Sequence, residues 1–384
     1  MIHVTVVCAV CICLYYCCAI LFLRTGLSKL TKGVSSISGN LKYSIIIAAH
    51  NEETNIEACL RSVFLQTLSA DRYEVILVND RSTDSTLEKA KALKAVYPNL
   101  SIITITKTEA GFSPKKYAVI QGVAAARNEI IVVTDADCRV LPTWLSVIGA
   151  CFTQNTGLVQ GITTYEYIQG MSRIFFGIQA LDFLSHGIIA AAAIGKNFPI
   201  NSNANNLAFR KKAYDDVGGY GAAGSVVSGD DDLLLQRLWK NKTWKICYMS
   251  NSDGSVITYP ARTLRDMFEQ RKRWGSKTVH YNTKQVLFLG GIFLFYIALL
   301  CMCVAACFSK TALIVAALMW LVKISGEYIL LIPGAKLFNK KELLSYTIPG
   351  SFFQLFMVLA AVIMGVFGKF GWKDQTFRRT VGHA

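Results

Sequence analysis

Two aspartates one residue apart, Asp135 and Asp137, are the residues of this sequence best suited to bind a metal ion. They follow closely on four β-branched apolar residues, 130–133, which predict a strand buried on both faces. Carboxylate oxygens at the end of such a strand suit Mg²⁺ or Mn²⁺ held between protein and substrate phosphates. Because Asp also favours ordinary turns, the pair predicts either a metal site or a strand-terminal turn.

Three consecutive acids, Asp230, Asp231 and Asp232, precede residues 233–239, which predict a helix. Acids in a first helical turn are ordinary stabilisers, worth about 0.3 to 1 kcal/mol each. Three in succession exceed that need, and one of them could act as a general base. The segment therefore fits a catalytic carboxylate as well as a helix start.

Polar side chains also follow two other predicted strands. Asn51 and Glu52 come after the strand at 44–49, and Asp80 comes after the strand at 73–78. Because the carboxyl ends of parallel strands meet at one edge of an α/β sheet, these side chains suit the base, ribose and phosphates of a nucleotide. Neither strand is followed by Gly-x-Gly-x-x-Gly or by Gly-Lys-Ser/Thr, which argues against a dinucleotide or P-loop enzyme.

Alternating strands and helices would position these residues. Strands are expected at 44–49, 73–78, 100–106 and 130–133, and helices at 52–66, 82–97 and 114–127. Such βα repeats predict an α/β fold with a parallel sheet and right-handed crossovers. Farther along, four asparagines within 201–206 predict a surface loop, with a sugar-binding wall as the alternative.

Three apolar blocks, 1–23, 286–308 and 344–367, contain no Asp, Glu, Lys or Arg. Each exceeds 20 residues, which at about 1.5 Å per residue crosses a hydrocarbon core of about 30 Å. A fourth run, 311–335, is interrupted by two charged residues, and 165–193 is too polar at its start for an obvious span. An integral membrane protein with a soluble middle part is therefore expected.

Charge indicates the orientation and the partners. The first apolar block lacks a basic n-region and a cleavage site, which favours an uncleaved anchor. Four basic residues and no acid follow over 24–42, which places the soluble part in the cytoplasm, at an inner or plasma membrane. The net charge of +15 fits anionic lipid and phosphorylated substrates, and nothing resembles a nucleic-acid-reading module. Eight of the twelve cysteines lie in apolar blocks, so neither disulfides nor a zinc site is predicted.

Residues 261–280 carry six basic side chains against two acids, with apolar residues on one helical face. This pattern is typical of an amphipathic helix lying in the membrane interface. The segment contains the sequence Gln270-Arg-Lys-Arg-Trp274.

Taken together, the chain resembles the family 2 glycosyltransferases, inverting enzymes with the GT-A fold, a Rossmann-like nucleotide-diphospho-sugar transferase domain. It is most similar to their membrane-embedded branch, which includes cellulose, chitin and hyaluronan synthases and ceramide glucosyltransferases. The resemblance covers about residues 41–280, in the family's order and spacing. It rests on Ala49-His-Asn-Glu52, Asn79-Asp80, Lys116 with Ala118 and Gly122, Asp135-Ala-Asp137, Asp230-Asp231 with Leu234 and Arg237-Leu238, and Gln270-x-x-Arg-Trp274.

The resemblance implies how the donor would be bound. Asn51, Glu52 and Asp80 would hold the nucleoside, and Lys116 would pair with the diphosphate. Asp137, assisted by Asp135, would bind the Mg²⁺ or Mn²⁺ that bridges the two phosphates.

The acceptor side follows in the same way. Asp231, with Asp230 beside it, would take the proton from the acceptor hydroxyl, and Asp135 would also face the nucleotide sugar. Gln270 and Arg273 would contact the nucleotide sugar, and Trp274 would form the floor of the acceptor site.

Two positions depart from the family pattern. The family usually has Glu-Asp where this chain has Asp230-Asp231, and often Asn where Gln121 precedes Gly122. The first departure leaves open a shift of the catalytic base by one residue.

The resemblance also implies the domain organisation. We expect an N-terminal transmembrane anchor over 1–24, a basic linker over 25–42, a GT-A catalytic domain over 43–260, an amphipathic interfacial helix over 261–283, a C-terminal transmembrane region of two to three helices over 286–368, and a basic tail over 369–384. The side of the membrane on which the tail lies stays open.

Few predicted spans favour a nonprocessive enzyme, because a polymer channel needs several helices around it. The expected substrates are a nucleotide-sugar donor and a membrane lipid or lipid-linked saccharide of the cell envelope. A processive polysaccharide synthase is the alternative, since such enzymes share Gln-x-x-Arg-Trp. A nucleotidyltransferase could use similar carboxylates, but it would not need that motif. No oligomeric state is predicted.

Overall fold

The computed structural model describes residues 2–30, 40–109, 112–221, 230–276, 281–367, 369–372 and 375–378. They belong to two compact units. The first, the sheet unit, comprises Leu30–Ile168 and Asn197–Tyr259, and the second, the helical unit, comprises Met1–Lys29, Gln169–Lys196 and Pro260–Val381. Half of the predicted basic linker, at 31–39, and half of the basic tail, at 373–374 and 379–384, lie outside the described residues.

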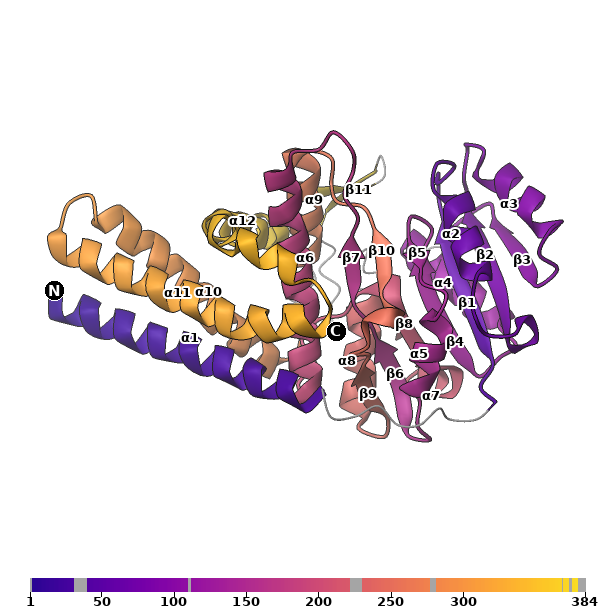
Figure 1. Cartoon of the computed structure of the whole chain (residues 1–384), viewed down its shortest axis with the longest axis horizontal. Coiled ribbons are helices and arrows are strands. Elements are labelled where there is room, and N and C mark those ends of the chain that lie inside the picture. Colours follow the sequence, from indigo (N-terminus) through magenta and orange to yellow (C-terminus); the bar gives the residue numbers. More distant parts are fainter. Residues whose placement is uncertain are drawn as a thin grey trace. The chain divides into compact units, whose positions relative to one another are not determined.

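The sheet unit alternates strands and helices (Figure 1). Its larger sheet contains β1 (Tyr43–Ala49), β2 (Tyr73–Asp80), β3 (Leu100–Ile105), β4 (Ile130–Asp135), β6 (Thr156–Gln160), β8 (Leu207–Arg210) and β9 (Lys245–Tyr248). Its smaller sheet contains β5 (Arg139–Val140), β7 (Thr163–Tyr165) and β10 (Val256–Thr258). Its helices are α2 (Ile56–Phe64), α3 (Thr86–Lys94), α4 (Pro114–Ala125), α5 (Trp144–Ala150), α7 (Lys211–Asp216) and α8 (Asp230–Asn241).

The larger sheet has the strand order β3-β2-β1-β4-β8-β6-β9. Strands β1, β2, β3 and β4 pair with one another in parallel, as the βα repeats predict. Strand β8 runs antiparallel to both β4 and β6. The chain leaves β1 toward β2 and β3 and returns on the other side of β1 with β4. Open α/β sheets bind ligands at the carboxyl ends of strands that flank such a switch of direction. There, Ala48 of β1 lies opposite Asp135 of β4.

Helices cover both faces of this sheet, because successive side chains of a strand point to opposite faces. Ile45 and Ile47 of β1 pack into a core with α2, α3 and α5, whereas Ile46 packs into a core with α4, α7 and α8. All three isoleucines are fully buried, which stabilises the fold by about 1.5 to 3 kcal/mol each. Gly122 lets α4 approach β1, since a Cβ atom there would lie 2.5 Å from Ile46 Cγ2.

The first helix of the sheet unit, α2, begins later than the start expected at residue 52. Asn51 has a φ of 53°, in the left-handed region, and the carbonyl oxygen of Glu52 accepts a hydrogen bond from Asn55 N at 2.9 Å. These residues form a turn, and α2 begins at Ile56. The turn keeps Asn51 and Glu52 at the edge of the sheet instead of on a helix.

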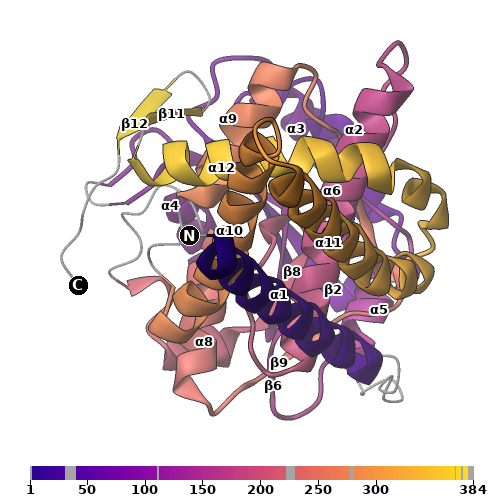
Figure 2. The same cartoon turned by 90° about the vertical axis from the view of Figure 1, so that its left-hand side faces the viewer.

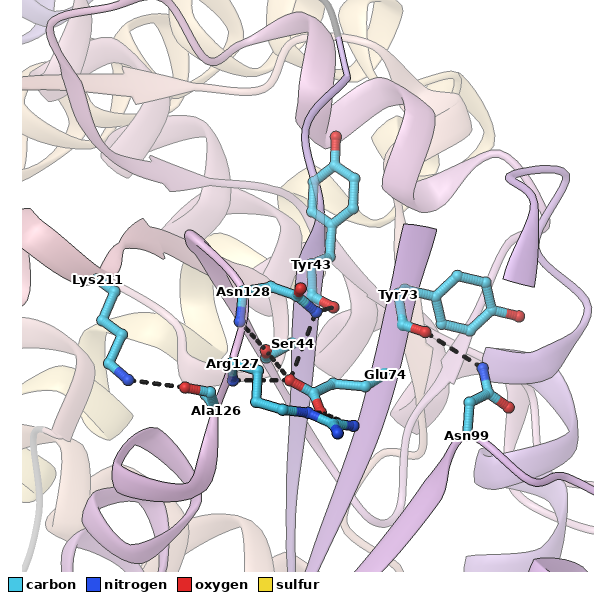
Figure 3. Close-up of polar contacts among 9 residues, drawn as sticks. All are labelled: Tyr43, Ser44, Tyr73, Glu74, Asn99, Ala126, Arg127, Asn128 and Lys211. Carbon is cyan, nitrogen blue, oxygen red and sulfur yellow. Dashed lines mark hydrogen bonds and ion pairs between the residues drawn. The ribbon is translucent and has the colours of Figure 1, made fainter. Parts of the chain in front are cut away.

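The amino edge of the sheet is held by a buried carboxylate (Figure 3). Glu74 accepts hydrogen bonds from Ser44 Oγ at 2.6 Å, from Arg127 N at 2.8 Å and from Arg127 Nε at 2.9 Å. Burial alone would raise the pKa of Glu74, but these hydrogen bonds and the Arg127 charge outweigh it, and the pKa is lowered. Asn128 adds a bond from its Nδ2 to Tyr43 O at 2.7 Å. This network joins β1, β2 and the end of α4 at the edge opposite Asp135.

The helical unit contains α1 (Ile2–Leu30), α6 (Arg173–Gly195), α9 (Leu264–Gly275), α10 (Thr283–Ala305), α11 (Lys310–Leu337) and α12 (Thr347–Phe367), labelled in Figure 2, with the antiparallel pair β11 (Lys369–Trp372) and β12 (Gln375–Arg378). Its apolar core joins α1, α10, α11 and α12. At its centre the ring of Tyr16 stacks on that of Phe295 at 4.1 Å.

Within the described part of the chain, five helices are long and apolar enough to cross a membrane: Val7–Leu30, Arg173–Gly195, Thr283–Ala305, Lys310–Leu337 and Lys341–Gly365. The predicted N-terminal and C-terminal membrane helices are therefore present. Segment 165–193 is expected to be too polar at its start for an obvious span, and α6 indeed begins only at Arg173, beyond that polar start. The helix itself is long and apolar enough to cross a membrane, which the sequence prediction missed.

The two charges of the run 311–335 are accommodated inside the helical unit. Lys323 is fully buried and pairs with Glu327 one helical turn away. Its Nζ also donates to Gln354 Oε1 of α12 at 3.2 Å, and Tyr296 of α10 donates to the same oxygen at 2.8 Å. Because each charged group has partners, a polar helix face is tolerated within an apolar unit.

Candidate active site

The carboxyl end of β4 carries the two aspartates singled out as metal ligands. Asp135 pairs with Lys115, whose Nζ lies 2.7 Å from Asp135 Oδ1. Burial, and then the charges of Asp135 and Glu52, raise the pKa of Asp137 to about 6. The end of this strand therefore holds more negative charge than its protein surroundings neutralise.

A divalent cation fits this charge. Among the described residues, no group of three or more His, Cys, Asp or Glu side chains is arranged to hold a metal ion. Asp135 and Asp137 offer hard carboxylate oxygens of the kind that Mg²⁺ and Mn²⁺ prefer, and a cation there would relieve the repulsion that raises the pKa of Asp137. Two carboxylates leave most of the coordination shell to water or substrate oxygens, as is usual for these ions beside phosphates.

The loops after β1 and β2 are joined by hydrogen bonds. Asn51 N donates to Ser82 Oγ at 3.1 Å, and Asn51 Oδ1 accepts from Thr83 N at 2.8 Å. Glu52 N donates to Thr86 Oγ1, at the start of α3, at 2.8 Å. The two loops therefore form one rigid surface beside the end of β4.

Asp80 ends β2 and is almost fully buried. Its two carboxylate oxygens accept from Arg81 Nε at 2.7 Å and from Arg81 NH2 at 3.0 Å. The carbonyl oxygen of Asp80 lies 2.6 Å from His50 Nδ1. The sequence places Asp80 correctly at this edge but gives no sign of its pairing with the next residue.

The segment 201–206 is not the surface loop that its asparagines predict. Asn206 is 1% exposed, and its Oδ1 accepts from Trp144 Nε1 at 2.9 Å. Its Nδ2 donates to the carbonyl oxygens of Ile162 and Gly254, at 2.8 and 2.9 Å. The amide is buried because it satisfies backbone groups of two other segments, which composition alone does not reveal.

Asp231 and Asp232, at the start of α8, accept hydrogen bonds from backbone N–H groups of segment 201–206. Asp231 Oδ2 accepts from Ala204 N at 2.9 Å and its Oδ1 from Asp232 N at 2.8 Å, while Asp232 Oδ1 accepts from Ser202 N. Asp231 is 6% exposed and Asp232 is fully buried. The side chain of Asp230 lies outside the described residues.

A short path connects the two groups of acids within the sheet unit. Asn205 Nδ2 donates to Cys138 Sγ at 3.2 Å, and that thiol donates to Asp137 Oδ1 at 3.4 Å. The neighbouring Ala204 contacts Asp231. The segment 201–206 therefore brings Asp137 and Asp231, 94 positions apart in the sequence, to the same part of the unit.

Lys115 is a residue that sequence reasoning missed. The resemblance pointed to Lys116, which is 1% exposed, whereas Lys115 carries the cation that meets Asp135. Both residues lie in the first turn of α4, where neighbouring side chains point in directions about 100° apart. The position of Pro114 at the start of that helix is the signal that could have separated them.

Gln270, Arg273 and Trp274 lie on α9 in the helical unit. Gln270 Oε1 accepts from Arg271 NH1 at 2.6 Å. The Trp274 ring stacks on Phe183 of α6 at 5.8 Å, and both Arg273 and Trp274 are partly exposed. These three residues thus lie on one helix, within two turns of each other.

Comparison with known proteins bears on the whole chain. Residues 5–383 match the sequence model of the family described as Glycosyl transferase family 21. Glycosyltransferase AglE of Haloferax volcanii is 26% identical over 240 residues, which are 60% of this chain and 71% of AglE. Beta-monoglucosyldiacylglycerol synthase of Synechocystis sp. is 27% identical over 241 residues, 60% of this chain but only 46% of the synthase. The chain thus spans about half the length of this second relative.

Among solved structures, mannosyltransferase PcManGT of Pyrobaculum calidifontis, in complex with GDP-Man and Mn²⁺, shares the fold at 17% identity and a TM-score of 0.58. The similarity covers 93% of this chain and 97% of that one. The expected GT-A fold is confirmed, as is the resemblance to membrane-embedded glycosyltransferases of the family 2 type.

Proposed function

Because the chain belongs to glycosyl transferase family 21, we propose that it transfers one sugar from a nucleotide-diphosphate sugar to a hydroxyl of a membrane lipid or lipid-linked acceptor, with inversion, at the cytoplasmic face. The observation that carries this proposal is the convergence of Asp135, Asp137 and Asp231 on one part of the sheet unit, through segment 201–206. A displacement at a sugar carbon needs both a stabilised leaving group and a proton acceptor, and these acids suit the two tasks.

The donor would lie across the carboxyl ends of β1, β2 and β4. Asn51, Glu52 and Asp80 would hold the nucleoside, on loops already tied to each other. Mg²⁺ or Mn²⁺, held by Asp137 and Asp135, would neutralise charge on the departing diphosphate. The complex of PcManGT with GDP-Man and Mn²⁺ supports such a donor and such an ion.

A lysine of the first turn of α4 would contact the diphosphate. The resemblance assigns this role to Lys116, and the ion pair of Lys115 with Asp135 adds a second candidate that already lies beside the proposed metal ligand. When the donor binds, the Lys115 ammonium group would leave the carboxylate of Asp135 and pair with a phosphate oxygen instead.

Asp231 would accept the proton of the attacking hydroxyl. Its oxygens accept backbone hydrogen bonds from Ala204 and Asp232, which fix the carboxylate in place, and an ionised carboxylate is a proton acceptor. The hydroxyl oxygen then attacks the anomeric carbon from the face opposite the nucleotide, whose bond to that carbon breaks. Asp230 would support the charge of this site, Gln270 and Arg273 would contact the donor, and Trp274 would form the acceptor floor.

The lipid acceptor is supported by five helices that could cross a membrane and by similarity to a glucosyldiacylglycerol synthase. The test is a transfer assay on the protein in lipid bilayers, with Mn²⁺, a panel of nucleotide sugars and a membrane lipid extract, and with products identified by mass spectrometry. A lipid that gains one sugar supports the proposal, whereas a ladder of many sugars would indicate a polysaccharide synthase.

The catalytic role of Asp231 is tested by the Asp231→Asn variant. Transfer should fall about 10² to 10⁴-fold, the range for loss of a general base, while the affinity for the nucleoside diphosphate stays within about twofold. Asp232→Asn is the matched control, because Asp232 holds Ser202 and has no proposed role in proton transfer. Equal turnover of Asp231→Asn and the native enzyme would exclude the role, and a loss confined to Asp232→Asn would move the base by one residue.

A further inference from the structure

Arg271 is a charged residue buried inside the helical unit, between a carboxylate and an indole ring. Its Nε atom donates to Asp182 Oδ2 of α6 at 2.8 Å, and its NH2 atom lies 2.6 Å from the same oxygen in an ion pair. Its guanidinium carbon lies 4.2 Å from the centre of the Trp274 ring. The side chains of Arg271 and Asp182 are 7% and 14% exposed, so the pair is largely removed from solvent.

The same face of α6 supplies the other contacts of this indole ring. Phe183 stacks on Trp274 with ring centres 5.8 Å apart, and His186 meets it edge-on at 5.5 Å. Asp182 and His186 are four residues apart and therefore adjacent on the helix surface. The Nδ1 atom of His186 lies 2.8 Å from Asp182 O, which orients the imidazole. One face of α6 and Arg271 therefore lie against the ring of Trp274, which stays partly exposed.

A buried ion pair is a costly way to join two helices. Apolar side chains of similar volume often stabilise a fold as well or better, so such a pair is weak evidence for a role in stability alone. Ionisable groups within candidate membrane helices usually mark functional sites. The geometry here also requires arginine, because only a planar guanidinium can donate to Asp182 and Gln270 while lying against an indole ring.

We infer that Asp182 and Arg271 are positioning residues that fix the ring of Trp274 for the acceptor. Asp182 orients the guanidinium, and the guanidinium in turn holds the indole ring and the Gln270 amide. The inference rests on the acceptor role proposed above for Trp274. Neither Asp182 nor Arg271 would touch the reacting atoms.

The first test observes the ring directly and does not depend on activity. The protein is labelled with 5-fluorotryptophan in lipid nanodiscs, and the ¹⁹F resonance of Trp274 is assigned by its absence in Trp274→Phe. Arg271→Lys and Asp182→Asn should shift or broaden that resonance. Glu269→Gln is the matched control, because it removes an ion pair with Lys272 on the same helix and should leave the resonance unchanged.

The second test separates positioning from a structural role by kinetics. Arg271→Lys and Asp182→Asn should raise the KM for the acceptor about tenfold, leave the KM for the donor unchanged, and leave donor hydrolysis by water at the native rate. The double variant with Arg271→Lys and Trp274→Phe should have the same KM for the acceptor as Trp274→Phe alone. If Asp182→Asn does not fold, Asp182→Glu and Arg271→Lys, which keep both charges, still provide the test.

The outcomes are distinct. An unchanged Trp274 resonance in Arg271→Lys, or equal losses in acceptor KM, donor KM and hydrolysis, would overturn the inference. A displaced resonance with a native acceptor KM in Trp274→Phe would support the positioning of the ring and would overturn the acceptor role of Trp274. If the native protein transfers no sugar but Arg271→Lys still displaces the Trp274 resonance, the proposed function is wrong and the positioning of the ring still holds.

Discussion

Replacing Asp137 with Asn should stabilise the metal-free protein. Burial and the neighbouring carboxylates Asp135 and Glu52 raise the pKa of Asp137 from 3.8 to about 6. An acid whose pKa is higher in the folded than in the unfolded protein lowers stability as pH rises from the unfolded toward the folded pKa. At about 1.4 kcal/mol for each pKa unit, the ionised carboxylate costs about 3 kcal/mol above pH 6. Asn has a similar shape and carries no charge.

The expected effect is measurable by thermal unfolding. For a folded unit of this size, about 2 to 4 °C accompany each kcal/mol, so Asp137→Asn should raise the Tm by about 6 to 12 °C at pH 8 in EDTA. The gain should shrink as pH falls from 6 toward 4, because the native Asp137 then takes up a proton. Saturating Mn²⁺ should stabilise the native protein and leave Asp137→Asn nearly unchanged, since a ligand that binds only the folded state raises its stability.

Asp84→Asn is a control for which the expected change in stability has the opposite sign. Although burial acts to raise it, hydrogen bonds from Thr86 and from Glu53 N lower the pKa of Asp84. Asp84→Asn should therefore lower the Tm at pH 8, with the difference shrinking as pH falls through that lowered pKa. If Asp137→Asn melts below the native protein at pH 8 in EDTA, or if its gain does not depend on pH, the electrostatic account of the metal site is refuted.

Two further predictions concern charged pairs of the sheet unit. Lys115→Met should weaken binding of a nucleoside diphosphate about tenfold, the effect of losing one charge-assisted hydrogen bond. The same variant should bind Mn²⁺ alone more tightly, because Lys115 no longer pairs with Asp135. Calorimetry of each ligand checks both effects, with Lys116→Met for comparison, and weaker Mn²⁺ binding would contradict the reasoning. Glu74→Gln should lower the free energy of unfolding at pH 7 by about 1 to 3 kcal/mol, the value of hydrogen bonds to a charged group. Because the pKa of Glu74 is lowered in the folded protein, this deficit should shrink as pH falls from the ordinary pKa of 4.5 through the lowered one. Chemical unfolding over this pH range checks the prediction, and a deficit that does not change with pH would show that the charge is irrelevant.

The part of the fold that follows from local pattern was predictable. Strands β1 to β4 are mainly apolar segments separated by helical segments, and β1, β2 and β4 are each followed or ended by polar residues. Asp135 and Asp80 could therefore be placed at one edge without knowing the structure. The acids at the start of α8 were equally visible, because a helix start is a local feature.

The rest depends on contacts between distant segments. Strand β8 has only four residues and lies between β4 and β6, so its place in the sheet is set by pairing and not by its own sequence. The burial of Asn206 likewise follows from carbonyl groups of Ile162 and Gly254 that it satisfies. The partner of Asp182 also follows from packing alone, because Arg271 lies 89 positions away in the sequence.

The order of segments along the chain has a consequence for biosynthesis. Strand β8 joins β4 to β6, and both segment 201–206 and α8 come after α6 in the sequence. Because synthesis runs from the N-terminus, α6 leaves the ribosome before the sheet can close and before Asp231 exists. Until then β4 presents an unpaired edge that invites wrong pairing. A nascent chain therefore completes the candidate membrane helices α1 and α6 before the acids proposed for catalysis can come together through segment 201–206.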